Sequence, residues 1–100
     1  MTDPLTIAIA YGEPPELHLR GELDLAATQV LSDAVSEAIG SGRPDLVVDL
    51  RAVTFCDSAG LSALVEIRHR VGRLRLRDVP RNVQRVLQLT GLDQLFEPVD

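Results

Sequence analysis

The sequence predicts an α/β fold in which a mixed central β-sheet of about four strands is covered by about three α-helices. Short apolar segments typical of strands alternate along the chain with longer segments whose apolar residues have helical spacing. The connections between successive strands are mostly a dozen residues or more, the length that parallel strands need. With 45% hydrophobic and 25% charged residues, a chain of 100 residues is expected to form one domain over residues 1–100.

The first part of the chain contains two predicted strands and a helix. Residues 5–9 alternate bulky and small side chains, and residues 17–21 alternate apolar and polar ones, with a Gly-Glu-Pro-Pro turn between them. Asp24 then precedes apolar residues that recur every three or four positions. This pattern predicts a helix that Asp24 caps and Gly40 ends.

The middle of the chain contains the predicted central strand and a second helix. Residues 46–50 read Leu-Val-Val-Asp-Leu, an apolar and β-branched segment without strict alternation, which indicates a strand buried on both faces. Apolar residues at helical spacing follow Ser58, so we expect Ser58 to be the N-cap of a second helix. Cys56, next to Phe55, is expected to be a packed thiol in a buried turn.

The last part of the chain predicts an outer strand and a third helix. Residues 73–77 alternate arginine and leucine, so the leucines should face the core while three arginines face solvent at the sheet edge. Pro80 opens the third helix and Gly91 ends it, with Val86 and Leu87 on the buried face.

The charges are unevenly distributed along the sequence. Residues 66–85 hold seven arginines and two acids, a net charge of +5, in a chain whose total is −5. This stretch has no aromatic residue to stack on bases, and the protein as a whole is acidic. We therefore expect a solvated basic face and no direct binding of nucleic acid; an acidic region of a protein partner is the other possible ligand for this face.

Several classes of protein are excluded by residues that the sequence lacks. The single cysteine, Cys56, and the absence of a secretory segment or of an apolar run of about 18 residues predict a cytoplasmic protein without membrane insertion. His18 and His69 are too few for a metal site, so neither metal nor cofactor is expected. Asp57 adjoins Ser58, but no histidine or lysine in that segment could act as a base, so the chain is not expected to be an enzyme.

Three segments, in order, carry a resemblance to a known family. They are Arg-Gly-Glu-Leu-Asp at 20–24, Asp-Leu at 49–50 followed by Phe-Cys-Asp-Ser-Ala-Gly-Leu at 55–61, and Leu-Thr-Gly-Leu at 89–92. Together they cover almost the whole chain, and the chain resembles the STAS family, in particular its small single-domain bacterial anti-sigma factor antagonists. It departs from the family pattern at Ala59, where a second serine or threonine is common, and at Ser62, where glycine is common.

The resemblance implies a regulator of transcription that works by partner switching. The unphosphorylated protein would bind an anti-sigma factor that is also a serine/threonine kinase, and so release a sigma factor. The kinase, which itself binds ATP, would phosphorylate Ser58 and end the complex, and a phosphatase would restore it. The implied partner-binding residues are Glu22, Asp24, Leu25, Asp57, Ser58, Ala59, Gly60, Leu61 and Ser62.

The residues themselves allow this mechanism and leave one alternative open. A phosphate at a helix N-terminus is tolerated by backbone N–H groups and the helix dipole, while its charge beside Asp57 would repel a partner bound there. In the alternative, the chain is a structural STAS subunit of a lipid-transport complex or signalling scaffold. Ser58 would then serve only as a helix cap, and binding would not be switched.

Overall fold

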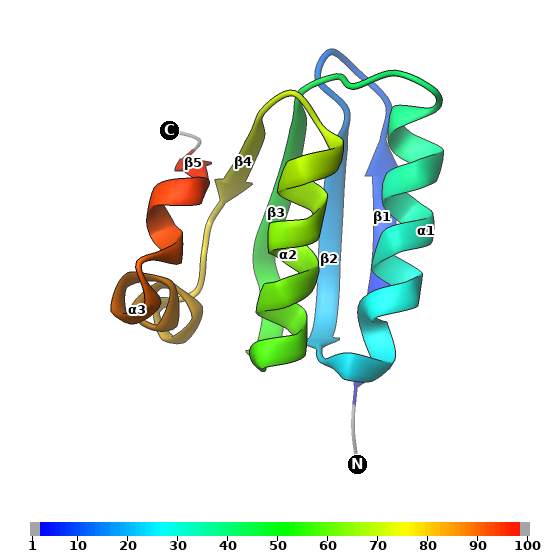
Figure 1. Ribbon diagram of the computed structural model, residues 1–100. Helices are drawn as coiled ribbons and strands as arrows, with labels where there is room; N and C mark the ends of the chain where they lie inside the picture. Colours follow the sequence, from blue (N-terminus) through cyan, green and yellow to red (C-terminus); the bar gives the residue numbers. More distant parts are fainter. Residues whose placement is uncertain (1–2, 99–100) are drawn as a thin grey trace.

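The computed structural model, which describes residues 3–98, has five strands in the sheet order β1-β2-β3-β4-β5 (Figure 1). β1 is antiparallel to β2, and all other neighbouring strands are parallel. The predicted mixed α/β sheet with three α-helices is confirmed, with a two-residue strand added at one edge. The elements are β1 (Thr6–Ala10), β2 (Glu16–Leu23), the 3-10 helix η1 (Leu25–Ala27), α1 (Thr28–Ile39), β3 (Leu46–Cys56), α2 (Ser58–Arg70), β4 (Leu74–Arg77), α3 (Arg81–Thr90), the 3-10 helix η2 (Leu92–Leu95) and β5 (Glu97–Pro98).

The central strand is β3, as residues 46–50 predicted, but it continues to Cys56. Its first five residues are buried except for the half-buried Asp49. This burial agrees with a central strand that has a neighbouring strand along each edge. From Arg51 onwards the strand alternates less regularly and is mostly exposed. This extension carries the chain to the edge of the sheet where the next helix begins.

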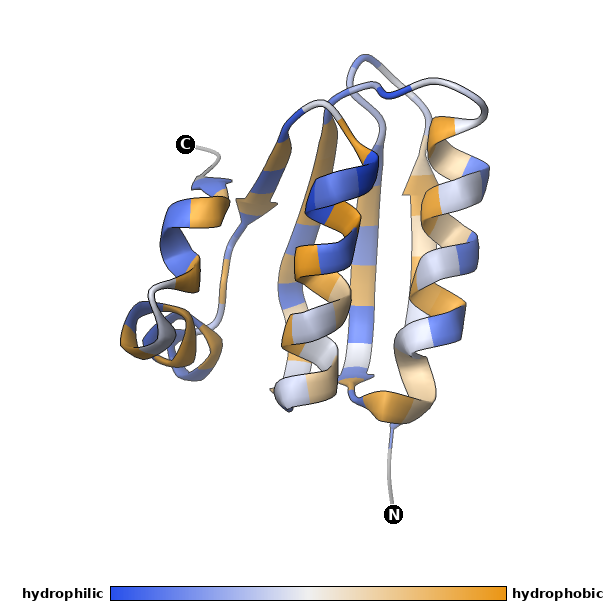
Figure 2. Ribbon diagram, viewed as in Figure 1, coloured by the Kyte–Doolittle hydropathy of each residue, from blue (hydrophilic) through white to orange (hydrophobic). Residues whose placement is uncertain are grey.

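The core lies between the sheet and the helices α1 and α2, which cover the same face (Figures 1 and 2). Leu31 and Val35 of α1 and Leu64 and Ile67 of α2 are buried against the sheet. Within the described part of the chain, no polar or charged side chain is buried. No helix among these residues is long and apolar enough to cross a membrane.

On the other face of the sheet, residues 3–98 place no helix, and charged side chains of the strands interact with one another there. His18 of β2 lies between two carboxylates, with Nε2 3.5 Å from Glu16 Oε1 and Nδ1 3.3 Å from Asp49 Oδ2. Arg77 of β4 forms an ion pair with the same Glu16. These contacts connect three neighbouring strands across their exposed face.

The N-terminal segment crosses the sheet at a bend in β2. Gly21 has a φ of +108°, and a Cβ atom there would lie 2.7 Å from the carbonyl oxygen of Pro4. Only glycine allows this approach. The approach lets the backbone N–H of Glu22 donate to the carbonyl of Asp3 over 2.9 Å.

The region after α2 differs from the prediction in two places. β4 is not the outermost strand, because β5 pairs with it. Next to this pair, Arg73 donates to Glu97 through two of its guanidinium nitrogens, with Nε 2.7 Å from Oε2. In α3, Val83 and Leu87 are buried, but Val86 is 37% exposed rather than part of the core. The helix lies beside β4 at one side of the sheet (Figure 1), so only a narrow side of it meets the core. Gly91 ends α3 with a φ of +76°, as predicted.

Candidate functional site

The candidate site lies where β2 and β3 end side by side. These strands are parallel, and the last residue of β2, Leu23, pairs in register with the last residue of β3, Cys56. The loops that follow them therefore begin at the same edge of the sheet, the lower edge in Figure 1. We call this edge the Ser58 end of the molecule. The two segments that the sequence singled out, 20–24 and 55–61, are brought together here.

Ser58 is the first residue of α2, and its N-cap is Asp57. The Asp57 carboxylate accepts the backbone N–H of Gly60, with Oδ1 2.9 Å from the nitrogen, and Asp57 has the extended conformation of a cap. The expectation that Ser58 caps the helix is therefore wrong, because the residue before it, an equally good cap, fills that role. Ser58 is exposed, and no hydrogen bond within residues 3–98 involves its hydroxyl.

Gly60 allows the start of α2 to pack directly on the end of β2. A Cβ atom at this position would lie 2.2 Å from the carbonyl oxygen of Leu23 and 3.0 Å from Cys56 Sγ. The same carbonyl accepts the N–H of Asp57 over 3.3 Å. The first turn of α2, and with it Ser58, is thus fixed against the sheet by backbone contacts.

The loop after β2 is built in a similar way but is less tightly packed. The Asp24 carboxylate accepts the backbone N–H of Ala27 over 3.2 Å and so caps η1, as the sequence predicted, although α1 itself begins only at Thr28. Leu25 is 72% exposed. Glu22 is half-buried, and its carboxylate accepts the backbone N–H of Asp3 over 2.9 Å.

The remaining predicted site residues lie in the first turns of α2. Ser62, one turn beyond Ser58, is exposed, and Ala59 is half-buried. Gly60 is buried and Leu61 is only 7% exposed. These last two residues therefore position the helix against the sheet and are not part of the outer surface.

Phe55 was missed as a site residue. Its side chain is 46% exposed at the end of β3, opposite Glu22 of β2, so the expected buried turn around Cys56 is only partly buried. Strand alternation offered no signal for this position, because Val53 is buried and Phe55 should then point the same way. The register between β2 and β3 shifts here, because Gly21 pairs with Val53 and Glu22 with Phe55, which leaves Thr54 as an extra residue. This irregularity turns Phe55 away from the face that Val53 occupies.

The titratable groups around Ser58 form no evident catalytic arrangement within residues 3–98. Burial and, secondarily, the nearby Asp57 carboxylate raise the pKa of the Cys56 thiol to about 11, so it is a neutral thiol at physiological pH. His18 lies on the open face of the sheet and His69 in the last turn of α2, so neither is a base for Ser58. Residues 3–98 contain no group of three or more histidine, cysteine or acidic side chains that could hold a metal ion.

All seven arginines of the basic stretch are exposed or half-buried, and several of them also bind other parts of the protein. Four of its seven arginines bind groups on other elements. Arg68 binds the Leu95 carbonyl, Arg70 binds Ser32 and Ser36, Arg73 binds Glu97, and Arg77 binds Glu16. Within residues 3–98, the side chains of Arg75, Arg81 and Arg85 have no hydrogen bond or ion pair.

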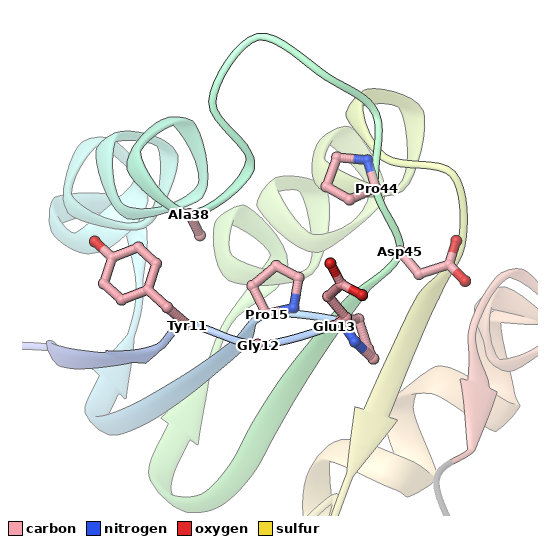
Figure 3. A pocket seen from close by; sticks show the side chains of 8 residues that line it. Tyr11, Gly12, Glu13, Pro15, Ala38, Pro44 and Asp45 are labelled. Carbon is pink, nitrogen blue, oxygen red and sulfur yellow. The ribbon is translucent and has the colours of Figure 1, made fainter.

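A hollow of about 510 Å³ lies at the opposite end of the sheet from Ser58. Figure 3 shows it between the β1–β2 turn, the end of α1 and the segment before β3. Tyr11, Ala38 and three prolines supply most of its walls, and Glu13 and Asp45 are its charged groups. No histidine, lysine or arginine lines it.

The fold and the site together define a small α/β binding module whose exposed serine begins a helix at the edge of a mixed sheet. Comparison with known proteins is more specific. The model of the family described as "Mlab, STAS domain" matches residues 10–97, and the chain belongs to this STAS family.

The similar proteins include regulators from mycobacteria and Bacillus. The anti-sigma-F factor antagonist RsfB of Mycobacterium tuberculosis is 32% identical over 98 residues, covering 94% of this chain and 80% of RsfB. An anti-sigma factor antagonist structure from Mycobacterium paratuberculosis has a TM-score of 0.83 at 26% identity, covering 98% and 89% of the two chains. Bacillus SpoIIAA shares the fold at 22% identity, with a TM-score of 0.72 for the unphosphorylated and 0.70 for the phosphorylated form. The respective coverages are 95% and 96% of this chain, and 89% and 91% of SpoIIAA.

Proposed function

We propose that this chain is an anti-sigma factor antagonist, acting as a single STAS domain over residues 1–100, whose binding is switched by phosphorylation of Ser58. The observation that carries the proposal is the state of the Ser58 hydroxyl. It is exposed at the start of α2, and the fold does not use it, because Asp57 is the cap. A kinase can therefore modify it without removing a contact that holds the helix.

In the unphosphorylated state the Ser58 end binds the anti-sigma factor. The accessible residues are the two acidic caps, Asp24 and Asp57, the exposed Leu25 and Phe55, and the outer side of the first turns of α2. Exposed apolar side chains beside polar groups are typical of protein interfaces. RsfB, at 32% identity, is an antagonist of an anti-sigma factor, which supports the same kind of partner here.

Phosphorylation would abolish binding by local electrostatics. It adds about −1.5 to −2 charges next to Asp57, so a partner surface that accepts this acidic end meets new repulsion and a larger desolvation cost. Backbone N–H groups at the start of α2 favour a phosphate, so the fold itself is retained. SpoIIAA supports this point, because its phosphorylated and unphosphorylated forms match this chain about equally well.

The partner supplies the chemistry of the cycle. The anti-sigma factor is proposed to be a serine/threonine kinase that binds ATP, and a separate phosphatase returns the chain to its binding state. This chain acts in the cytoplasm as substrate and ligand, not as an enzyme. The Ser58 end supports that role, since it places no histidine near the hydroxyl.

The test compares phosphomimetic changes at two exposed serines of α2. The wild type, Ser58→Ala, Ser58→Glu and the matched control Ser62→Glu are titrated against each purified anti-sigma factor kinase of the host by isothermal calorimetry. We expect Ser58→Ala to bind like the wild type, Ser58→Glu to bind at least a hundredfold more weakly, and Ser62→Glu to lose much less. Equal affinities of Ser58→Ala and Ser58→Glu would refute the switch, provided circular dichroism shows all variants folded.

The same variants test the alternative of a non-switching STAS subunit. In that case a component of a transport complex or scaffold would bind all four proteins equally, and incubation with kinase and ATP would leave Ser58 unmodified. The structure gives this alternative no support from capping, because Asp57 and not Ser58 accepts the helix N–H group.

A further inference from the structure

Helix α3 lies at the Ser58 end of the molecule although it is distant from Ser58 in sequence. β3 and β4 are parallel, and the last residue of β4, Arg77, pairs with Asp49 in the first half of β3. From there the chain runs on towards the Ser58 end and enters α3, which Figure 1 shows at the height of the first turns of α2. Any large partner that covers Ser58 therefore reaches the neighbourhood of α3.

The Ser58 end has an unusual share of the exposed apolar side chains. Leu89 of α3 is 80% exposed and Val86, one turn before it, is 37% exposed. With Leu25 and Phe55, they make four of the seven large hydrophobic side chains that are exposed in the described residues. Single exposed leucines need no explanation, but a concentration of them at one end of a small domain indicates an interaction surface.

The packing of α3 determines which way its exposed apolar side faces. Gln84 and Gln88 line a hollow together with Phe96 and Glu97, so this side of the helix faces η2 and β5. At 100° per residue, Val86 and Leu89 lie on the side of α3 turned away from these elements. η2 and β5 lie above α3 in Figure 1, so the side of the helix turned away from them is the side nearer the lower edge, the edge of Ser58.

The charges at this end differ between its two halves. Around Ser58 the groups are acidic, Asp24 and Asp57. On α3 they are basic, because Arg81 and Arg85 are exposed and, within residues 3–98, make no hydrogen bond or ion pair. Arg85 is one helical turn from Leu89, so a cation and an apolar side chain lie together on the helix surface.

We propose that α3 is a second docking surface for the same anti-sigma factor, formed by Arg85, Val86 and Leu89. The element that fits it is an acidic amphipathic segment, whose apolar side chains cover Val86 and Leu89 and whose carboxylates bind Arg85. The inference rests on the proposed function. Because the acidic and basic halves demand opposite charges, they fix the orientation of the partner. A phosphate on Ser58 affects only the acidic half of this surface. The phosphorylated protein therefore still binds the anti-sigma factor weakly through α3.

The experiment titrates α3 variants against the host anti-sigma factor kinase that binds the wild type most tightly. Leu89→Ser removes an exposed side chain, and its matched control is Tyr11→Ser at the opposite end of the sheet, where Tyr11 is 69% exposed. Arg85→Gln changes the charge by −1, and its matched control is the same substitution at Arg51, an exposed arginine of β3. Each variant is also made with Ser58→Glu to measure the residual binding.

We expect Leu89→Ser to weaken binding about tenfold and Arg85→Gln about threefold, while each control changes it less than twofold. The same factors should appear in the Ser58→Glu background. Unchanged binding by both α3 variants, together with a normal effect of Ser58→Glu, would overturn this inference alone. Loss at α3 without an effect of Ser58→Glu would retain the surface and refute the switch. If no anti-sigma factor kinase of the host binds the wild type, both proposals are wrong.

Discussion

The loops after β2 and β3 begin alike and differ in how firmly they are held. Each starts with an aspartate whose carboxylate accepts the N–H three residues further on. After Asp57 an α-helix begins at once, pressed through Gly60 against the carbonyl of Leu23. After Asp24 comes a three-residue 3-10 helix whose Leu25 is 72% exposed. The phosphoacceptor proposed here thus lies on the rigid loop, and the most exposed apolar contact on the looser one.

The largest effect is expected where the rigid loop touches the sheet. Gly60→Ala places a Cβ atom 2.2 Å from the backbone oxygen of Leu23, which cannot move without disturbing β2. We expect the free energy of unfolding to fall by about 3 kcal/mol, measured by urea denaturation. Gly42→Ala is the control, because its Cβ would lie no closer than 3.8 Å to any neighbour. A tolerated Gly60→Ala would mean that α2 is not fixed in this way.

Removing the cap of the rigid loop should cost more stability than removing the cap of the looser loop. Asp57→Ala removes the acceptor at 2.9 Å that begins a 13-residue helix, and we expect a loss of about 1.5 kcal/mol. Asp24→Ala removes a longer contact to a three-residue helix and should cost about 0.5 kcal/mol. Asp57→Asn, which retains the acceptor, should recover most of the loss. Equal costs at the two positions would remove the distinction between a rigid and a loose loop.

Leu25 should matter for binding and very little for stability. Its side chain is mostly in solvent, so Leu25→Ser should change the free energy of unfolding by less than about 0.5 kcal/mol. Affinity for the anti-sigma factor should fall about tenfold, since exposed apolar residues near the centre of an interface contribute strongly. Calorimetric binding and urea denaturation of the same preparation separate the two quantities. A variant that destabilises the fold without weakening binding would contradict this assignment.

The smallest effect on stability at neutral pH is expected from Cys56, the residue before the rigid loop. Its pKa is raised to about 11, mainly by burial, from an ordinary value of 9.0. Both folded and unfolded forms therefore hold a neutral thiol at pH 7, and the stability that the raised pKa contributes is complete below pH 9 and is lost as the pH rises through 11. Alkylation by iodoacetamide at pH 8 should be far slower in the native protein than in urea. Equal rates would show that the first turn of α2 opens freely.

Most of the fold follows from sequence patterns because those patterns reflect burial. Leucines at 17 and 19 and the apolar residues 46–48 occupy the core as predicted. β5 could not be predicted, since two residues carry no periodicity and the strand is held by the Arg73–Glu97 contact between distant parts of the chain. Val86 was placed wrongly because helical spacing gives the angle around a helix but not the width of its contact with the sheet.

The sequence motif indicated where the candidate site lies. Which of its residues caps the helix, and which packs against the sheet, depends on the three-dimensional structure. Ser and Asp are both good caps, so the sequence 57–58 alone could not decide which residue begins the helix. The reason for Gly60 is a contact with β2, 37 positions earlier in the chain, and no local pattern contains it. Phe55 is exposed where the register between β2 and β3 shifts by one residue, and such an irregularity depends on the pairing of two strands far apart in sequence.

The internal use of arginines in the basic stretch has a consequence for behaviour in the cell. The guanidinium groups of Arg68 and Arg70 bind a backbone carbonyl and serine oxygens, and those of Arg73 and Arg77 bind glutamates. Oxygens of the protein thus occupy the positions that nucleic-acid phosphates would take. Glu16 and Glu97, which lie outside the stretch, pair with two of its arginines and reduce its local net charge from +5 to +3, which weakens its attraction for nucleic-acid phosphates.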